Sequence, residues 1–185
     1  MELLEGERLD RLIDPARPLP LARVKSILGE VAAGLQEAHA LGIVHRDLKP
    51  GNIILTANRL KILDFGIANM AGYDTRLTQT GFAVGSPMYM SPEQLQGVLV
   101  DGRSDLYALG VLAHALVAGQ EPFDGPTAAA IAIKHLQQPV PDLRRMRPDL
   151  PPGWAELVGK LLAKRPSERY QTATEVSAAL AALPV

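Results

Sequence analysis

The apolar residues of this chain change their spacing along its length, and each spacing predicts a different element. Between Leu21 and Leu41 they recur every three or four positions, which indicates one face of an amphipathic helix that Gly42 ends. Two short apolar runs, NIILT at 52–56 and LKILD at 60–64, are divided by AN. They predict a small β-hairpin early in the chain.

A second long helix is expected from Ser104, as its N-cap, to about Ala118, with Gly119 as the stop. This segment is apolar almost all round, which is typical of a buried central helix. Further helices are expected at 127–137, 153–163 and 172–182, and irregular stretches at 14–20, 64–92 and 139–152. The predicted fold is therefore α+β and mainly α-helical, with one hairpin.

Composition places the chain among globular proteins and excludes several classes of function. Of its 185 residues, 47% are hydrophobic and 21% are charged, which fits a single domain. Nineteen basic and twenty acidic residues give a net charge of −1, so no nucleic-acid partner is expected. There is no cysteine and no apolar stretch of about 20 residues, the length that spans a bilayer. The acidic start is not a secretory signal, and we expect a cytoplasmic protein.

Polar residues gather around the predicted hairpin. Asn52 precedes its first strand, Asp64 ends its second, and Asp47 and Lys49 lie in the loop before it. Because a hairpin brings its two ends together, Asn52 and Asp64 should converge. A carboxylate and an amide oxygen are suitable ligands for Mg²⁺, and Lys49 could face a phosphate. The pattern therefore indicates phosphoryl transfer, with Asp47 as the acceptor of a hydroxyl proton.

The sequence resembles the protein kinase family, and most closely the bacterial-type serine/threonine kinases. The resemblance covers essentially all 185 residues and keeps the order and spacing of the family's motifs. Lys49, two positions after Asp47, fits serine/threonine rather than tyrosine specificity. The matching segments are HRDLKPGN at 45–52, DFG at 64–66, GSPMYMSPEQ at 85–94, DGRSDLYALGVLAHALVAGQEPFDG at 101–125 and RPSERYQTATEV at 165–176.

The resemblance implies a kinase that transfers the γ-phosphate of ATP to Ser or Thr hydroxyls of proteins. Asp47 would accept or orient the substrate hydroxyl, and Lys49 would steady the transferred phosphate. Asn52 and Asp64 would hold Mg²⁺, Ile54 would floor the adenine pocket, and the backbone of residues 1–4 would bond adenine. The expected cofactor-binding residues are Glu2, Leu4, Asn52, Ile54 and Asp64.

A second set of residues would shape and regulate the site. Arg46 would bind a phosphate on the activation loop, and its candidate acceptors are Thr78 and Thr80, although threonines are also ordinary loop residues. Glu93 and Arg169 would form a buried ion pair that anchors the activation segment. The remaining members are His45 and Phe65, which would stack on one another, Ser86, which stands where threonine is usual, and Asp105, which would brace the catalytic loop. His39, His114 and His135 are scattered, and we expect ordinary surface or core residues there.

The family also needs a glycine-rich loop, a lysine strand and a partner glutamate, which residues 1–185 lack. We therefore expect the C-terminal lobe alone, beginning at the hinge, with the small lobe missing. The hypotheses are a serine/threonine kinase completed by that lobe, an inactive lobe that serves as a docking or scaffold module, and a non-functional truncated product. Weak binding of Mg-ATP and self-association through the exposed hinge face would follow from the missing lobe.

Overall fold

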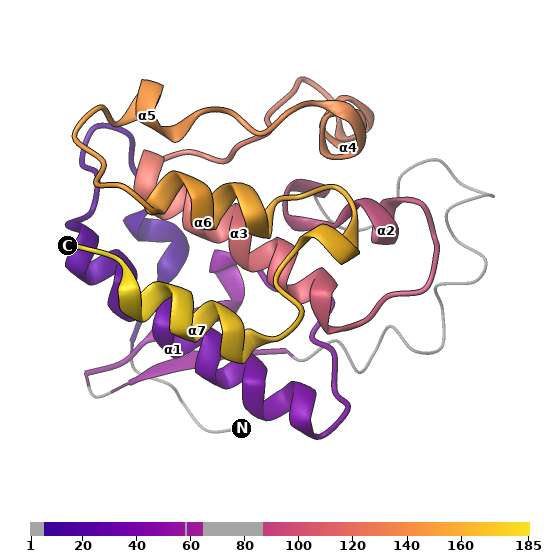
Figure 1. Cartoon of the computed structure of the whole chain (residues 1–185), viewed down its shortest axis with the longest axis horizontal. Coiled ribbons are helices and arrows are strands. Elements are labelled where there is room, and N and C mark those ends of the chain that lie inside the picture. Colours follow the sequence, from indigo (N-terminus) through magenta and orange to yellow (C-terminus); the bar gives the residue numbers. More distant parts are fainter. Residues whose placement is uncertain (1–5, 58, 65–86) are drawn as a thin grey trace.

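The computed structural model describes residues 6–57, 59–64 and 87–185, and Figure 1 shows a mainly helical architecture. The helices are α1 (Leu21–Ala40), α2 (Pro92–Leu95), α3 (Gly102–Ala118), α4 (Ala128–Gln137), α5 (Leu143–Met146), α6 (Trp154–Leu161) and α7 (Ala173–Ala182). The strands are β1 (Glu7–Arg8), β2 (Ile53–Leu55) and β3 (Leu60–Ile62), and the 3₁₀ turns are η1 (Leu9–Leu12), η2 (Pro50–Asn52), η4 (Pro87–Tyr89) and η5 (Pro166–Glu168). The predicted fold class is confirmed.

Helix α3 forms the centre of the core, as its apolar sequence predicts. Every residue from Ser104 to Val117 is buried. Helix α1 packs against both α3 and α7, and α6 packs against the other side of α3 (Figure 1). A Cβ atom added at Gly110 of α3 would lie 2.7 Å from Leu161 Cβ, so this glycine permits the close approach of α6. Gly119 ends α3 in the left-handed conformation, with φ 74°, as the sequence predicts.

The start of α3 differs from the prediction. The helix is capped by Asp101, whose side chain accepts a hydrogen bond from Arg103 N at 2.9 Å. Ser104 lies inside the first turn, and its hydroxyl donates to Glu93 Oε1 at 2.6 Å. The prediction failed because Asp and Ser are both good N-caps. The choice between them depends on Glu93, a partner eleven residues away in the chain.

The predicted hairpin is confirmed, and a third strand joins it. Strands β2 and β3 pair antiparallel with Ile53 opposite Ile62, and β1 pairs with the other edge of β2. Strand β3 lies beside α1, where Ile62 Cδ1 would be 3.0 Å from a Cβ atom added at Gly34. Strand β1 has two polar residues only, and such a segment carries no strand pattern of its own.

The remaining boundaries were predicted closely, with two short helices missed. Thr127 and Thr172 are N-caps, so α4 and α7 each begin one residue later than predicted. Residues 139–152 are not wholly irregular, because α5 begins there after Asp142, whose carboxylate accepts from Arg144 N at 3.0 Å. The described end of the 64–92 segment contains η4, and α2 follows with Ser91 and Gln94 as a capping box.

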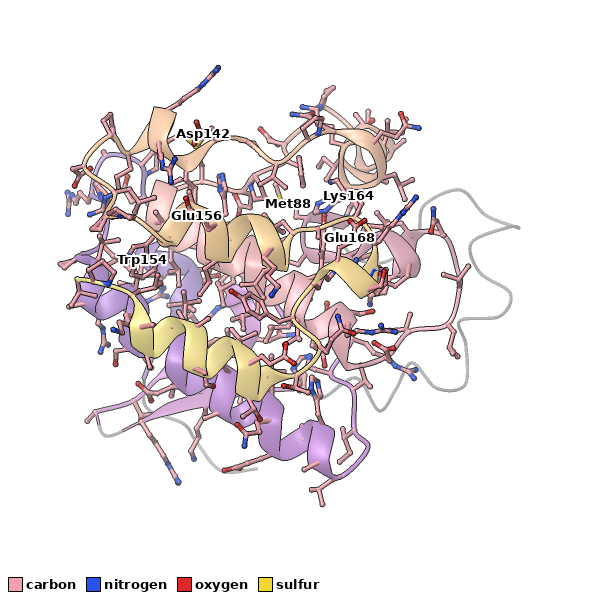
Figure 2. All side chains as sticks on the ribbon, viewed as in Figure 1. Met88, Asp142, Trp154, Glu156, Lys164 and Glu168 are labelled. Atoms are coloured by element: carbon pink, nitrogen blue, oxygen red, sulfur yellow. The ribbon has the colours of Figure 1, made fainter. Side chains whose placement is uncertain are left out.

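The last residues of the chain are held against the helices. Trp154, at the start of α6, donates from Nε1 to Pro184 O at 2.9 Å, and Figure 2 shows its place beside the C-terminal segment. Lys25 on α1 donates from Nζ to Leu183 O at 2.7 Å. Within the described ranges, no helix combines the length and the apolar character needed to cross a bilayer.

Candidate active site

The backbone of the loop between α1 and β2 is held by α3. Asp105, with 1% of its side chain exposed, accepts from His45 N at 2.9 Å through Oδ2 and from Arg46 N at 2.8 Å through Oδ1. Gln94 of α2 donates from Nε2 to Arg46 O at 2.8 Å. Arg46 has φ 66°, a left-handed conformation that costs a non-glycine residue free energy. Hydrogen bonds on both sides of Arg46 therefore hold a strained turn directly before Asp47.

Three of the predicted catalytic and metal residues are connected by hydrogen bonds. Lys49 Nζ lies 2.7 Å from Asp47 Oδ2, and Asn52 Nδ2 donates to the same oxygen at 3.1 Å. Asn52 Nδ2 also donates to Asp47 O at 2.9 Å. Asp47 and Lys49 are 46% and 42% exposed, whereas Asn52 is buried. The carboxylate of Asp47 is thus oriented from two sides and still open to solvent.

The hairpin brings Asn52 and Asp64 to the same end, as the sequence predicts. Leu63 N donates to Asn52 O at 2.8 Å, which extends the β2–β3 pairing by one step. Asp64, the next residue, has φ 52°, so its backbone turns out of the strand in the left-handed region. His45 Nε2 lies 3.0 Å from Leu63 O and joins the loop to this end of β3.

Ile54 lies in the middle of the small sheet. It pairs with Lys61 on one side and with Arg8 on the other, and its side chain is half-buried. A Cβ atom added at Gly6 would lie 2.5 Å from Ile54 Cγ2, so Gly6 passes directly against this side chain. Six predicted site residues lie outside the described residues and stay predictions: Glu2, Leu4, Phe65, Thr78, Thr80 and Ser86.

The predicted ion pair between Glu93 and Arg169 is present and almost fully buried. Arg169 Nη1 and Nη2 lie 2.7 and 2.8 Å from the two carboxylate oxygens of Glu93, and the side chains are 0% and 7% exposed. The guanidinium also donates to the carbonyls of Ala163, Lys164 and Arg103, so all five N–H groups have acceptors. Burial alone would raise the pKa of Glu93, but hydrogen bonds from Arg169 and Ser104 and the charge of Arg169 hold it below the ordinary value.

A second buried polar cluster surrounds His135 on α4. Its Nδ1 lies 2.9 Å from Tyr107 Oη, and the Phe123 ring packs against it edge-on at 4.8 Å. Lys164 donates to His135 O at 2.7 Å and lies over the Phe123 ring, and Figure 2 labels Lys164 near α4. Burial, and then the charge of Lys164, lowers the pKa of His135 to about 4. His135 is therefore a neutral core residue, as the sequence predicts.

Sequence reasoning missed two residues that contact this site. Gln94 lies in the kinase-like segment 85–94, but no local pattern indicates its bond to Arg46 O, which depends on the capping box that orients it. His39 was expected to be ordinary, yet its Nε2 lies 2.7 Å from Asp105 Oδ2. Neither contact has a local sequence pattern, because the partners are 48 and 66 positions apart.

Known proteins share much of this sequence. A family model described as protein kinase domain matches residues 1–179. The chain belongs to the protein kinase family. The kinase PknA of Mycobacterium tuberculosis, a serine/threonine-protein kinase, is 41% identical over 184 residues, which are 99% of this chain and 42% of PknA. The serine/threonine-protein kinase PrkC of Bacillus subtilis is 39% identical over 179 residues, which are 96% of this chain and 28% of PrkC.

Solved kinase structures have the same fold. The crystal structure of the Mycobacterium tuberculosis PknI kinase domain superimposes with a TM-score of 0.75 at 31% sequence identity. The superposition covers 98% of this chain and 63% of the PknI chain. The chain thus spans less than half of the curated kinases cited above and about two thirds of a solved kinase domain. The resemblance to bacterial-type serine/threonine kinases is confirmed.

Proposed function

We propose that residues 1–185 supply the larger, C-terminal lobe of a serine/threonine protein kinase that transfers the γ-phosphate of ATP to protein hydroxyls. The observation that carries this proposal is the orientation of Asp47. Its carboxylate is fixed by Lys49 and Asn52, and its backbone follows a turn that Asp105 and Gln94 hold. A group placed in this way, and left open to solvent, suits proton transfer to or from a bound hydroxyl.

Each residue around Asp47 has a role in this proposal. Asp47 accepts a hydrogen bond from the substrate hydroxyl and orients its oxygen for attack on the γ-phosphorus. Lys49 bonds to Asp47 Oδ2, and its charge would steady the transferred phosphate. As the hydroxyl oxygen bonds to the γ-phosphorus, the bond between that phosphorus and the bridging oxygen of ATP breaks, ADP leaves with the bonding electrons, and the hydroxyl proton passes to Asp47. The positioning of these groups supplies much of the catalysis in phosphoryl transfer.

The chemistry of Asn52 and Asp64 fits a magnesium ion. The amide nitrogen of Asn52 is engaged by Asp47, which leaves Oδ1 as the free ligand atom, and Asp64 adds a carboxylate at the same end of the hairpin. Among the described residues no group of three or more His, Cys, Asp or Glu could hold a metal. A site with two protein ligands suits Mg²⁺ that is shared with nucleotide phosphates, and such an ion neutralises phosphate charge when bound.

The nucleotide site is only half built by these residues. We propose that Ile54 floors the adenine pocket and that Glu2 and Leu4 bond adenine through their backbone. The upper half would come from a small lobe that lies outside residues 1–185. The lobe alone should therefore bind Mg-ATP weakly, and we propose that it self-associates through its hinge face. We place it in the cytoplasm, where ATP and protein substrates are available.

The remaining residues hold and regulate the activation segment in this proposal. The Glu93–Arg169 pair fixes the described end of that segment against η5 and α3. Arg46 would bind a phosphate carried by Thr78 or Thr80, and Phe65 would stack on His45. Ser86 keeps the hydroxyl of the usual threonine. Phosphate mapping after incubation with Mg-ATP, with Thr78→Ala and Thr80→Ala as controls, tests the first of these roles.

The experiment that tests the function measures transfer of labelled γ-phosphate to the chain itself and to a generic basic protein. Residues 1–185 are assayed alone and joined behind the small lobe of a relative such as PknA, each with Asp47→Asn as the control. The joined chain should transfer label and its control should not, while the lobe alone should bind Mg-ATP with a Kd above about 1 mM. If the joined chain binds Mg-ATP but transfers no label, the proposal is wrong and a docking module is favoured.

A further inference from the structure

Arg8 lies directly against the loop that carries the proposed catalytic residues. A Cβ atom added at Gly51 would be 2.8 Å from Arg8 Nη2 and 3.8 Å from Arg8 Cζ, so the guanidinium rests on the bare backbone of Gly51. Gly51 is the middle residue of η2, next to Asn52 and two positions after Lys49. A charged group from β1 is therefore placed beside the residues to which the proposed function assigns magnesium and the transferred phosphate.

The guanidinium of Arg8 is oriented by Asp10 and still has N–H groups to donate. Its Nε and Nη2 lie 3.3 and 2.7 Å from the two carboxylate oxygens of Asp10, which makes the pair bidentate. An arginine carries five N–H groups, and this pair uses two of them. The Arg8 side chain is 54% exposed, and within residues 6–57, 59–64 and 87–185 its Nη1 has no hydrogen-bond partner. Arg8 therefore presents unused donors to solvent.

The Arg8–Asp10 pair is also close to η4, the first described segment after the activation loop. Burial, then the charge and hydrogen bond of Glu121, and then the charge of Asp10 raise the pKa of Tyr89 above its ordinary value. Asp10 is therefore near Tyr89 on one side, while its partner Arg8 contacts η2 on the other. Under the proposed function, a protein substrate that brings its hydroxyl to Asp47 lies beside these segments, so residues that flank the hydroxyl can reach Arg8.

We propose that Arg8 is a specificity-determining residue, which binds a carboxylate side chain of the protein substrate close to the acceptor hydroxyl. This inference rests on the proposed function and names a substrate class for that site. The planar guanidinium suits a carboxylate, because two parallel N–H groups can meet its two oxygens. Asp10 and Glu121 already have partners, since Asp10 binds Arg8 and Glu121 accepts from Tyr89 Oη at 3.1 Å. A cationic substrate residue would compete with these partners and would be repelled by Arg8.

The first test measures peptide binding to residues 1–185 without nucleotide, so that no phosphate is transferred. Short alanine-rich peptides carry one threonine, and a single glutamate or lysine is moved through the flanking positions. For at least one position, the glutamate peptide should shift the NMR signals of Arg8 Nε–H and Gly51 N–H and bind about five-fold more tightly than its lysine counterpart. Arg8→Ala should remove this preference and Arg8→Glu should reverse it. Arg17→Ala, which removes an exposed arginine at the other end of α3, should alter nothing.

The second test compares phosphate transfer to the same peptides by the chain joined to a small lobe. The preference for glutamate should appear in the KM for the peptide and leave kcat nearly unchanged, because Arg8 binds the substrate and takes no part in the chemical step. Asp10→Asn, which frees Arg8 from its partner, should widen the preference, and Gly51→Ala, which displaces the guanidinium, should narrow it. An unchanged ratio in Arg8→Glu, or no glutamate-dependent shift at Arg8, would overturn the inference. If no chain transfers phosphate, the proposed function fails, and the titration still decides whether Arg8 selects carboxylates.

Discussion

Two ion pairs in this lobe have the same N–O separation and opposite surroundings. Lys49 Nζ lies 2.7 Å from Asp47 Oδ2, and both side chains are more than two fifths exposed. Arg169 Nη1 also lies 2.7 Å from Glu93 Oε1, where neither side chain is more than 7% exposed. Distance alone would rank them as equals. Water screens the first pair and is excluded from the second, so their contributions to stability should differ several-fold.

The difference shows that exposed and buried polar groups have separate roles in this lobe. The proposed catalytic groups Asp47 and Lys49 lie in a loop at the surface, where each can change partners when a ligand arrives. The groups that keep that loop in place are buried in and around α3, where Asp105 and Arg169 have all their hydrogen bonds satisfied by fixed partners. Changes to the buried groups should therefore cost more stability than changes to the exposed ones.

Removal of Arg169 should be the most damaging change. Arg169→Ala removes the charged partner of the buried carboxylate of Glu93 and one donor to each of three carbonyls, and it should lower the free energy of unfolding by about 3–5 kcal/mol. Denaturation in urea measures this loss. Arg165→Ala, which removes a guanidinium whose side chain is 80% exposed, is the matched control and should change little. A small loss in Arg169→Ala would mean that the pair is not desolvated.

As the pH falls, the lobe should lose stability first through protonation of His135 and only at lower pH through Glu93. The pKa of His135 is about 4 in the folded chain and 6.5 when unfolded, so the unfolded chain takes up a proton that the folded one refuses. The contribution of neutral His135 to the free energy of unfolding is therefore complete above pH 6.5 and is lost as the pH falls to about 4. The total loss is roughly 3 kcal/mol. The lowered pKa of Glu93 acts only below its ordinary value of 4.5.

The measurement is the unfolding free energy between pH 7 and pH 4 in the wild type and in His135→Gln. The variant should show a flatter profile in this window, because it cannot titrate there. An offset between the two profiles at pH 7 reports lost packing around Tyr107 and Phe123 and is separate from the difference in slope between pH 7 and pH 4. Parallel profiles for the two chains would contradict the assigned pKa.

The contact between α3 and α6 should tolerate no added atom. Gly110→Ala places a Cβ atom 2.7 Å from Leu161 Cβ and 3.1 Å from Leu162 Cγ, so the helices must separate, at a cost of about 1–3 kcal/mol. Gly29→Ala on α1 meets nothing within 4 Å and should stabilise the helix by up to about 1 kcal/mol. Thermal unfolding of the two variants should therefore shift in opposite directions, and equal shifts would show that the α3–α6 approach is looser.

Loss of Lys49 should have the smallest effect on stability. Lys49→Met removes an exposed partner of Asp47 and should change the unfolding free energy by less than about 1 kcal/mol. In the chain joined to a small lobe, the same change should reduce phosphate transfer at least ten-fold, because the proposed function assigns Lys49 to the transferred phosphate. Wild-type transfer in a folded Lys49→Met chain would remove this residue from the proposed mechanism.

Elements with a local pattern were predicted from the sequence, and those that depend on distant partners were not. The spacing of apolar residues predicted α1, and the unbroken apolar run predicted that α3 is buried. Strand β1 forms because it pairs with β2. Its two polar residues have no alternating pattern from which a strand could be predicted. The one-turn helix α5 is too short to show a period. Asp101 is the N-cap of α3, because the hydroxyl of Ser104 donates instead to Glu93.

The same distinction holds within the candidate site. The hairpin pattern predicted that Asn52 and Asp64 lie at the same end of the hairpin, since this follows from chain connectivity. The pairing of Glu93 with Arg169 was predicted only from family resemblance, because 76 positions separate the two residues and no local pattern links them. His39 and Gln94 were missed, because their contacts with Asp105 and Arg46 exist only once α1, α2 and α3 are packed around the loop.

Double-mutant cycles on the two ion pairs test the central contrast most directly. One cycle combines Asp47→Asn with Lys49→Met, and the other combines Glu93→Gln with Arg169→Met, each read as unfolding free energies in urea. We predict a coupling energy below about 1 kcal/mol for the exposed pair and above about 2 kcal/mol for the buried pair. Equal coupling energies would contradict the account, because burial would then not decide what these two pairs contribute.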